Sequence, residues 1–124
     1  MNHYTYCIMH KPTGYFYVGV RSSVQNPDVD HYWGSGQLLW KAYNCQGFGD
    51  VHFRSGESPP PEWEKYILAT YDSRVQACTD ESCLISSVLQ DEKCLNKAGF
   101  GHDNVDAAKK LANVRKCFTL RTWV

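Results

Sequence analysis

Two tyrosine-containing segments and one arginine near the start of the chain have the chemistry to act on a phosphate. The segments 4–6 (YTY) and 17–19 (YVG) flank a turn at 11–14 (KPTG), and Arg21 follows the second segment. A phenol can donate or accept a hydrogen bond, and it loses its proton more readily beside a cation. A guanidinium forms paired hydrogen bonds with a phosphate and offsets charge in a transition state. The pattern therefore predicts a phosphate site, although tyrosines in strands more often serve only packing.

A carboxylate later in the chain is the candidate metal ligand. Glu81 shares a helical stripe with Ala77, Leu84, Ile85 and Val88, so we expect it to point inward. An isolated buried carboxylate is costly unless it has a cation or a hydrogen-bond partner. One Mg²⁺ or Mn²⁺ ion fits, because such ions are held by one or two carboxylates together with waters and phosphate. The alternative is a glutamate at the edge of the stripe that reaches water, Lys or Arg.

These groups need strands and helices to position them. The aromatic and alternating segments predict a hairpin of strands 4–10 and 15–20, with Arg21 in an irregular stretch that continues to residue 33. Glycines at 34 and 36 precede a helix with a buried stripe, and Asp72 or Ser73 is suited to cap the helix that carries Glu81. The remaining elements are expected as a helix over 37–45, a strand over 63–71, a helix over about 74–90, a helix over 105–116 and a short strand over 118–124. Asp103 or Asn104 would cap the helix over 105–116.

In this order the residues resemble the GIY-YIG nuclease domain, particularly its short phage-type members. The segments 4–6 and 17–19 stand at the two three-residue signatures, and 32–36 (YWGSG) is similar to the entry to the first helix of the phage members. Two positions depart from the family pattern: Tyr4 replaces the first glycine, and Arg21 comes earlier than the arginine of many members.

The resemblance implies a fold and a set of roles. The fold is a small α/β (α+β) sandwich, in which a three-stranded antiparallel sheet is flanked by helices. Tyr17 would be the general base, Tyr6 would position the water or the phosphate, and Arg21 would hold the scissile phosphate. Glu81 would bind one Mg²⁺ or Mn²⁺ ion, and Asn96 would brace the site through hydrogen bonds. The implied reaction is metal-dependent hydrolysis of DNA phosphodiester bonds by in-line attack of water.

Charge gives a weaker indication of nucleic acid. The formal net charge is zero, whereas nucleic-acid binders usually carry a basic excess. We expect residues 1–101 to form the nuclease domain and residues 102–124 to form a basic helix and tail packed on it; the stretch 107–124 contains no acidic residue. The candidate DNA contacts are His31, Lys41, Lys109, Lys110, Arg115 and Lys116; ordinary surface charge explains them equally well.

Composition and cysteines leave other functions open. The six cysteines contain no CxxC pair, so idle thiols are favoured over a zinc site that includes Cys78 and Cys83. No leader or membrane-length apolar run is visible, and we expect a cytoplasmic protein, in the host cell if a phage encodes it. The chief alternative is an inactive interaction protein on the same scaffold, such as a phage factor that inhibits a host defence protein. A nucleotide or RNA substrate and self-association also stay open.

Overall fold

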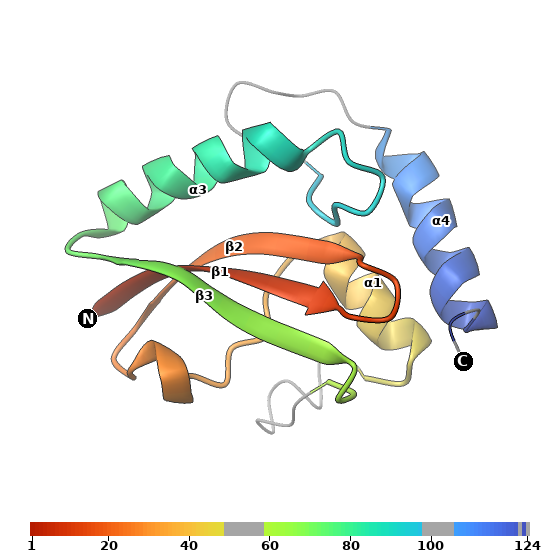
Figure 1. Cartoon of the computed structure of the whole chain (residues 1–124), viewed down its shortest axis with the longest axis horizontal. Coiled ribbons are helices and arrows are strands. Elements are labelled where there is room, and N and C mark those ends of the chain that lie inside the picture. The colour runs from red at the N-terminus through yellow and green to blue at the C-terminus, as the bar shows by residue number, and fades with distance from the viewer. Residues whose placement is uncertain (49–58, 98–105, 122, 124) are drawn as a thin grey trace.

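Three antiparallel strands form the sheet at the centre of the molecule, in the order β2–β1–β3. The structure is a computed structural model that describes residues 1–48, 59–97, 106–121 and 123. The strands are β1 (Asn2–His10), β2 (Phe16–Ser23) and β3 (Trp63–Tyr71). A short 3₁₀ helix, η1 (Pro27–Val29), and the helices α1 (Gln37–Cys45), α3 (Arg74–Val88) and α4 (Ala107–Leu120) surround the sheet (Figure 1).

The two faces of the sheet carry separate cores, because successive side chains of a strand point to opposite faces. On one face Tyr6 and Ile8 of β1 pack with Leu39 of α1 and Phe118 of α4. On the other face Val18 of β2 packs with α3. Figure 1 shows α3 running along one side of the sheet, while α4 stands beyond its end. The predicted α+β class, a three-stranded antiparallel sheet flanked by helices, is therefore confirmed.

Local sequence explains where the helices begin. The Ser73 hydroxyl accepts a hydrogen bond of 3.2 Å from the Gln76 amide and caps α3, and Asp106 caps α4 in the same way. Helix α1 begins at Gly36, which offers no side-chain cap. The predictions of α1, of β3 and of Ser73 as a cap are confirmed, and α3 ends at Val88, slightly before the expected residue 90.

Two expectations about the elements were wrong. Arg21 lies within β2 rather than in a loop, because residues 21–23 continue the ladder opposite residues 4, 3 and 2 of β1. The segment from 118 does not begin a strand: Val114 and Phe118 share a buried helical face, and α4 continues to Leu120. The expected helix start at residue 105 and the caps at 103 and 104 lie outside the described residues.

Within the described part of the chain, no helix is both long enough and apolar enough to span a membrane.

Candidate active site

Three phenol rings meet on the face of the sheet that packs against α1. The ring centroids of Tyr6 and Tyr17 are 6.3 Å apart, and the Tyr32 ring meets Tyr6 edge-on at 5.9 Å. Tyr6 is buried and its hydroxyl bonds to that of Tyr32, whereas Tyr17 is only partly buried. The hairpin therefore brings its two signature tyrosines together, and Tyr17 is the one that solvent reaches.

Two glycines allow this close packing. A Cβ atom at Gly19 would overlap the Tyr6 hydroxyl, and a Cβ atom at Gly36 would overlap the Tyr17 ring. Ser35 also hydrogen-bonds to the Tyr17 hydroxyl. The segment that opens α1 thus both makes room for the Tyr17 ring and supplies a partner for its oxygen.

The outer edge of β2 carries two more of the predicted site residues. The Asn96 amide accepts a bond of 3.0 Å from the Val18 N–H and donates one of 2.8 Å to the Val18 carbonyl. The Glu81 carboxylate accepts a hydrogen bond from the N–H of Val20, the next outward-facing residue. Asn96 and Glu81 therefore complete the unpaired edge of the strand that carries Tyr17.

Glu81 belongs to a helix on the face of the sheet opposite the tyrosine rings. Its side chain extends from α3 to the strand edge, where the two faces meet. There its charge contributes to raising the pKa of Tyr17, which means that the carboxylate and the phenol interact electrostatically. Glu81 is therefore related to Tyr17 through the edge of β2, to which its carboxylate bonds, and not through a shared face of the sheet.

Burial shifts the pKa values of Glu81 and Tyr17. Burial raises the pKa of Glu81, against the opposing effects of Arg74 and the Val20 N–H. Burial also raises the pKa of Tyr17, although the Ser35 hydrogen bond opposes the shift. A raised phenol pKa keeps Tyr17 neutral at pH 7, so this arrangement supplies a hydrogen-bond donor and does not by itself activate a base.

Arg21 is linked to the phenols through Tyr32. Its guanidinium carbon lies 4.4 Å from the centre of the Tyr32 ring, and its Nε donates to Asp30 Oδ2 at 3.1 Å. The same oxygen accepts a bond of 2.7 Å from Tyr4. Burial alone would raise the pKa of Asp30, but the bonds from Tyr4 and Arg21 outweigh it, and the pKa lies below its ordinary value.

Sequence reasoning missed this network around Asp30 and its second cation, Lys65. The Lys65 ammonium donates to the Tyr4 hydroxyl and to the Tyr32 carbonyl, each at 2.8 Å, and burial lowers the pKa of Lys65 to about 8. The available signal was a polar lysine at an inward position of a strand, since Lys65 lies between Trp63 and Ile67 on the same face.

The described residues of the candidate site offer one carboxylate ligand, so a bound metal ion would keep most of its coordinated waters. Among the described residues, no group of three or more His, Cys, Asp or Glu is placed to hold an ion together. Glu81 is partly buried and has no Lys, Arg or His nitrogen within ion-pair distance in the described part of the chain. One carboxylate with waters and a substrate phosphate is a common setting for Mg²⁺, so Glu81 fits as a single protein ligand.

The predicted DNA-contacting residues occupy several different surfaces. His31, Lys109 and Lys116 are exposed, while Lys41 of α1 and Arg115 of α4 line one groove. Lys110 differs from them: its ammonium donates to the carbonyls of residues 89, 94 and 96 at 2.9, 2.8 and 3.1 Å, so its donors hold the chain together.

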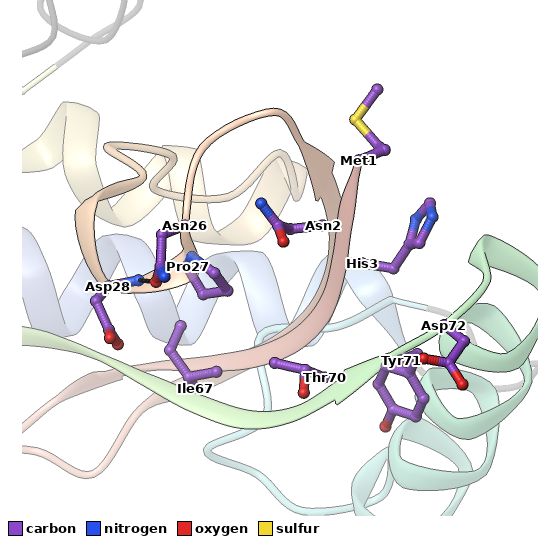
Figure 2. Close-up of a pocket in the computed structure, with 10 residues that line it drawn as sticks. All are labelled: Met1, Asn2, His3, Asn26, Pro27, Asp28, Ile67, Thr70, Tyr71 and Asp72. Atoms are coloured by element: carbon purple, nitrogen blue, oxygen red, sulfur yellow. Dashed lines mark hydrogen bonds between the residues drawn. The ribbon is translucent and has the colours of Figure 1, made fainter.

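A separate polar hollow of about 480 Å³ lies where β1 begins and β3 ends (Figure 2). His3, Tyr71 and Asp72 line one side of it, and Asn26 lies on the other, with its side chain accepting a bond from the Asp28 amide. None of the five predicted catalytic residues lines this hollow.

The candidate site therefore joins Tyr6, Tyr17, Glu81 and Asn96 around β2, with Arg21 reaching it through Tyr32. A comparison of the chain with protein families, characterised proteins and solved structures found no match to any of them.

Proposed function

We propose that the protein is a GIY-YIG-type endonuclease that hydrolyses DNA phosphodiester bonds with one Mg²⁺ or Mn²⁺ ion. The observation that carries this proposal is that Glu81 bonds to the outer edge of β2, the strand that also carries the partly exposed Tyr17. Burial raises the pKa of both side chains, and titratable groups with perturbed pKa values concentrate at functional sites.

Each residue has a role that its surroundings support. Glu81 would hold the ion, whose charge would stabilise the leaving oxygen. Tyr17, kept neutral by burial, would orient the attacking water or a phosphate oxygen through its hydroxyl hydrogen. Arg21 would contact the phosphate, since its side chain is 36% exposed. Tyr6 and Asn96 are buried; Tyr6 would support the Tyr17 ring and Asn96 would fix the strand edge.

Cutting of supercoiled plasmid with Mg²⁺ or Mn²⁺ tests the proposal. We expect nicking by the parent protein and a loss of at least about 100-fold in Glu81→Ala and in Tyr17→Phe, since each removes one group from the reacting centre. Two matched controls are Glu92→Ala and Tyr66→Phe, which change an exposed carboxylate and an exposed phenol outside the site. Both controls should cut like the parent.

The proposal is wrong if pure parent protein cuts no DNA with either metal. It is equally wrong if Glu81→Ala cuts as well as Glu92→Ala, because the activity would then come from another site or a contaminant.

A second candidate is an inactive interaction protein on this scaffold, such as an inhibitor of a host defence protein. Two observations favour it: the Tyr17 pKa is raised, and the Nε of Arg21 is already bonded to Asp30. Parent protein that binds no DNA and forms a stoichiometric complex with a host protein would support it. Either function is consistent with our proposed location in the cytoplasm, and with self-association or recruitment by a partner.

A further inference from the structure

A groove between α1 and α4 gathers positive charge from three separate parts of the chain. Lys41 comes from α1, Arg115 from α4, and Lys97 from the segment that follows α3. The groove has a volume of about 360 Å³, and no acidic residue among those that the structure describes lines it. We propose that this groove binds the phosphate backbone of the DNA on which the candidate site acts; the inference rests on the proposed function.

Two residues that line the groove are chain neighbours of residues at the candidate site. Lys97 directly follows Asn96, which clamps the β2 edge, and the Lys97 ammonium bonds to the Gln37 side chain at the start of α1. Gln37 in turn follows Gly36, against which the Tyr17 ring packs. A strand whose scissile phosphate lies at Tyr17 and Glu81 would therefore lead its neighbouring phosphates along Lys97 and Lys41.

Helix geometry decides which cations of α4 take part. Ala108, Leu111 and Arg115 have the i, i+3, i+7 spacing of one helical face, and all three line the groove. Lys109 and Lys116 are also seven residues apart, so they share a different face. Of the four basic residues from 109 to 116, only Arg115 is directed at the groove.

The local backbone adds to the attraction for phosphate. Helix α1 starts beside the groove: Gln37 and Leu38 of its first turn line it, and the N-cap Gly36 provides no side-chain hydrogen bond to the first amides. Lysines and arginines that contact phosphates release counterions, and each such contact lowers the slope of log K against log salt by about 0.9 on duplex DNA.

Binding of a short fluorescent DNA duplex in EDTA tests this proposal without cleavage. The groove variant carries Lys41→Gln, Lys97→Gln and Arg115→Gln, and the control carries Lys109→Gln, Lys116→Gln and Arg121→Gln, so both lose the same charge. We expect the groove variant to bind at least about 30-fold more weakly, with a salt slope smaller by about 2 to 3, since three phosphate contacts are lost. The control should stay within about threefold of the parent because none of its three cations lines the groove.

Equal weakening of the two variants, with both folded by circular dichroism, would overturn the groove proposal. So would cleavage of plasmid by a groove variant that binds like the parent, a result that leaves the nuclease proposal intact. Binding that depends on the groove, in a parent protein that never cuts, would instead overturn the nuclease proposal alone.

Discussion

The Nε atom of Arg21 donates a 3.1 Å hydrogen bond to Oδ2 of Asp30, a side chain only 4% exposed. Tyr4, the cross-strand partner of Arg21, donates to the same oxygen. Tyr4 and Arg21 are the two positions at which the sequence differs from the GIY-YIG pattern that it otherwise resembles. Both departures therefore converge on one buried carboxylate, which fixes the direction of the Arg21 side chain.

Asp30→Ala should lower the free energy of unfolding by about 2 kcal/mol. Removing one partner of a buried pair costs about 3–5 kcal/mol, and the partial exposure of Arg21 reduces that figure. Plasmid cutting should fall about 10- to 100-fold, because Arg21 loses its orientation. Urea denaturation and the plasmid assay measure the two effects. Asp28→Ala is the matched control, an exposed aspartate two residues away; equal stability of the two variants would show that the Asp30 network contributes nothing.

Asn96→Asp should destabilise the protein by about 2 kcal/mol, because the new oxygen would face the Val18 carbonyl without a hydrogen to donate. The amide is buried, so water cannot take its place. Thermal unfolding measures the loss, and Asn113→Asp, on the exposed face of α4, should stay within about 0.5 kcal/mol of the parent. A small effect at Asn96 would mean that the strand edge is held by other bonds.

The strands and helices could be predicted from the sequence where the pattern is local. The bounds of α1 and β3, and the cap at Ser73, follow from periodicity and short-range hydrogen bonding. Arg21 was misassigned because its polarity suggests a loop, whereas the ladder with β1 continues through it. Phe118 was misassigned because an aromatic segment at a chain end resembles a strand, and only its packing in the core shows that the helix continues.

The sequence predicts which residues belong to the candidate site but not the contacts that they make. Nothing in the spacing indicates that Asp30 would meet Arg21 or that Lys65 would reach Tyr4. The first contact depends on where the 24–36 segment places Asp30, and the second on the pairing of β3 with β1. Lys110 shows the same limit: its charge and its place in a basic helix predict a DNA contact, yet its ammonium binds three carbonyls. Sequence identifies which side chains have suitable chemistry, while long-range packing decides which of them are available.

Gly36→Ala should reduce both stability and activity, whereas a glycine outside the site should affect stability alone. The added methyl group would overlap the Tyr17 ring, which must move, at a cost of about 1–3 kcal/mol. Cutting should fall at least about 10-fold, because the displaced phenol no longer faces the edge of β2. Gly47→Ala is the control: its φ of +82° makes alanine strained by about 1 kcal/mol, but nothing lies within 4 Å of the added atom. Full activity in Gly36→Ala would show that the position of the Tyr17 ring is unimportant.

Glu81→Gln should stabilise the metal-free protein at pH 7, raising its melting temperature by about 1–3 °C. The pKa of Glu81 is raised on folding, so the folded state binds this proton more tightly than the unfolded state. The charged carboxylate is therefore unfavourable at neutral pH, and this penalty disappears as the pH falls through the folded pKa toward the ordinary range of glutamate. Glutamine keeps the acceptor for the Val20 N–H, so the difference between variant and parent should shrink at acidic pH.

Mg²⁺ should stabilise the parent and leave the variant unchanged. Scanning fluorimetry across pH measures this, with Glu92→Gln as the exposed control; a variant less stable than the parent at pH 7 would show that a partner already neutralises Glu81 in the absence of metal.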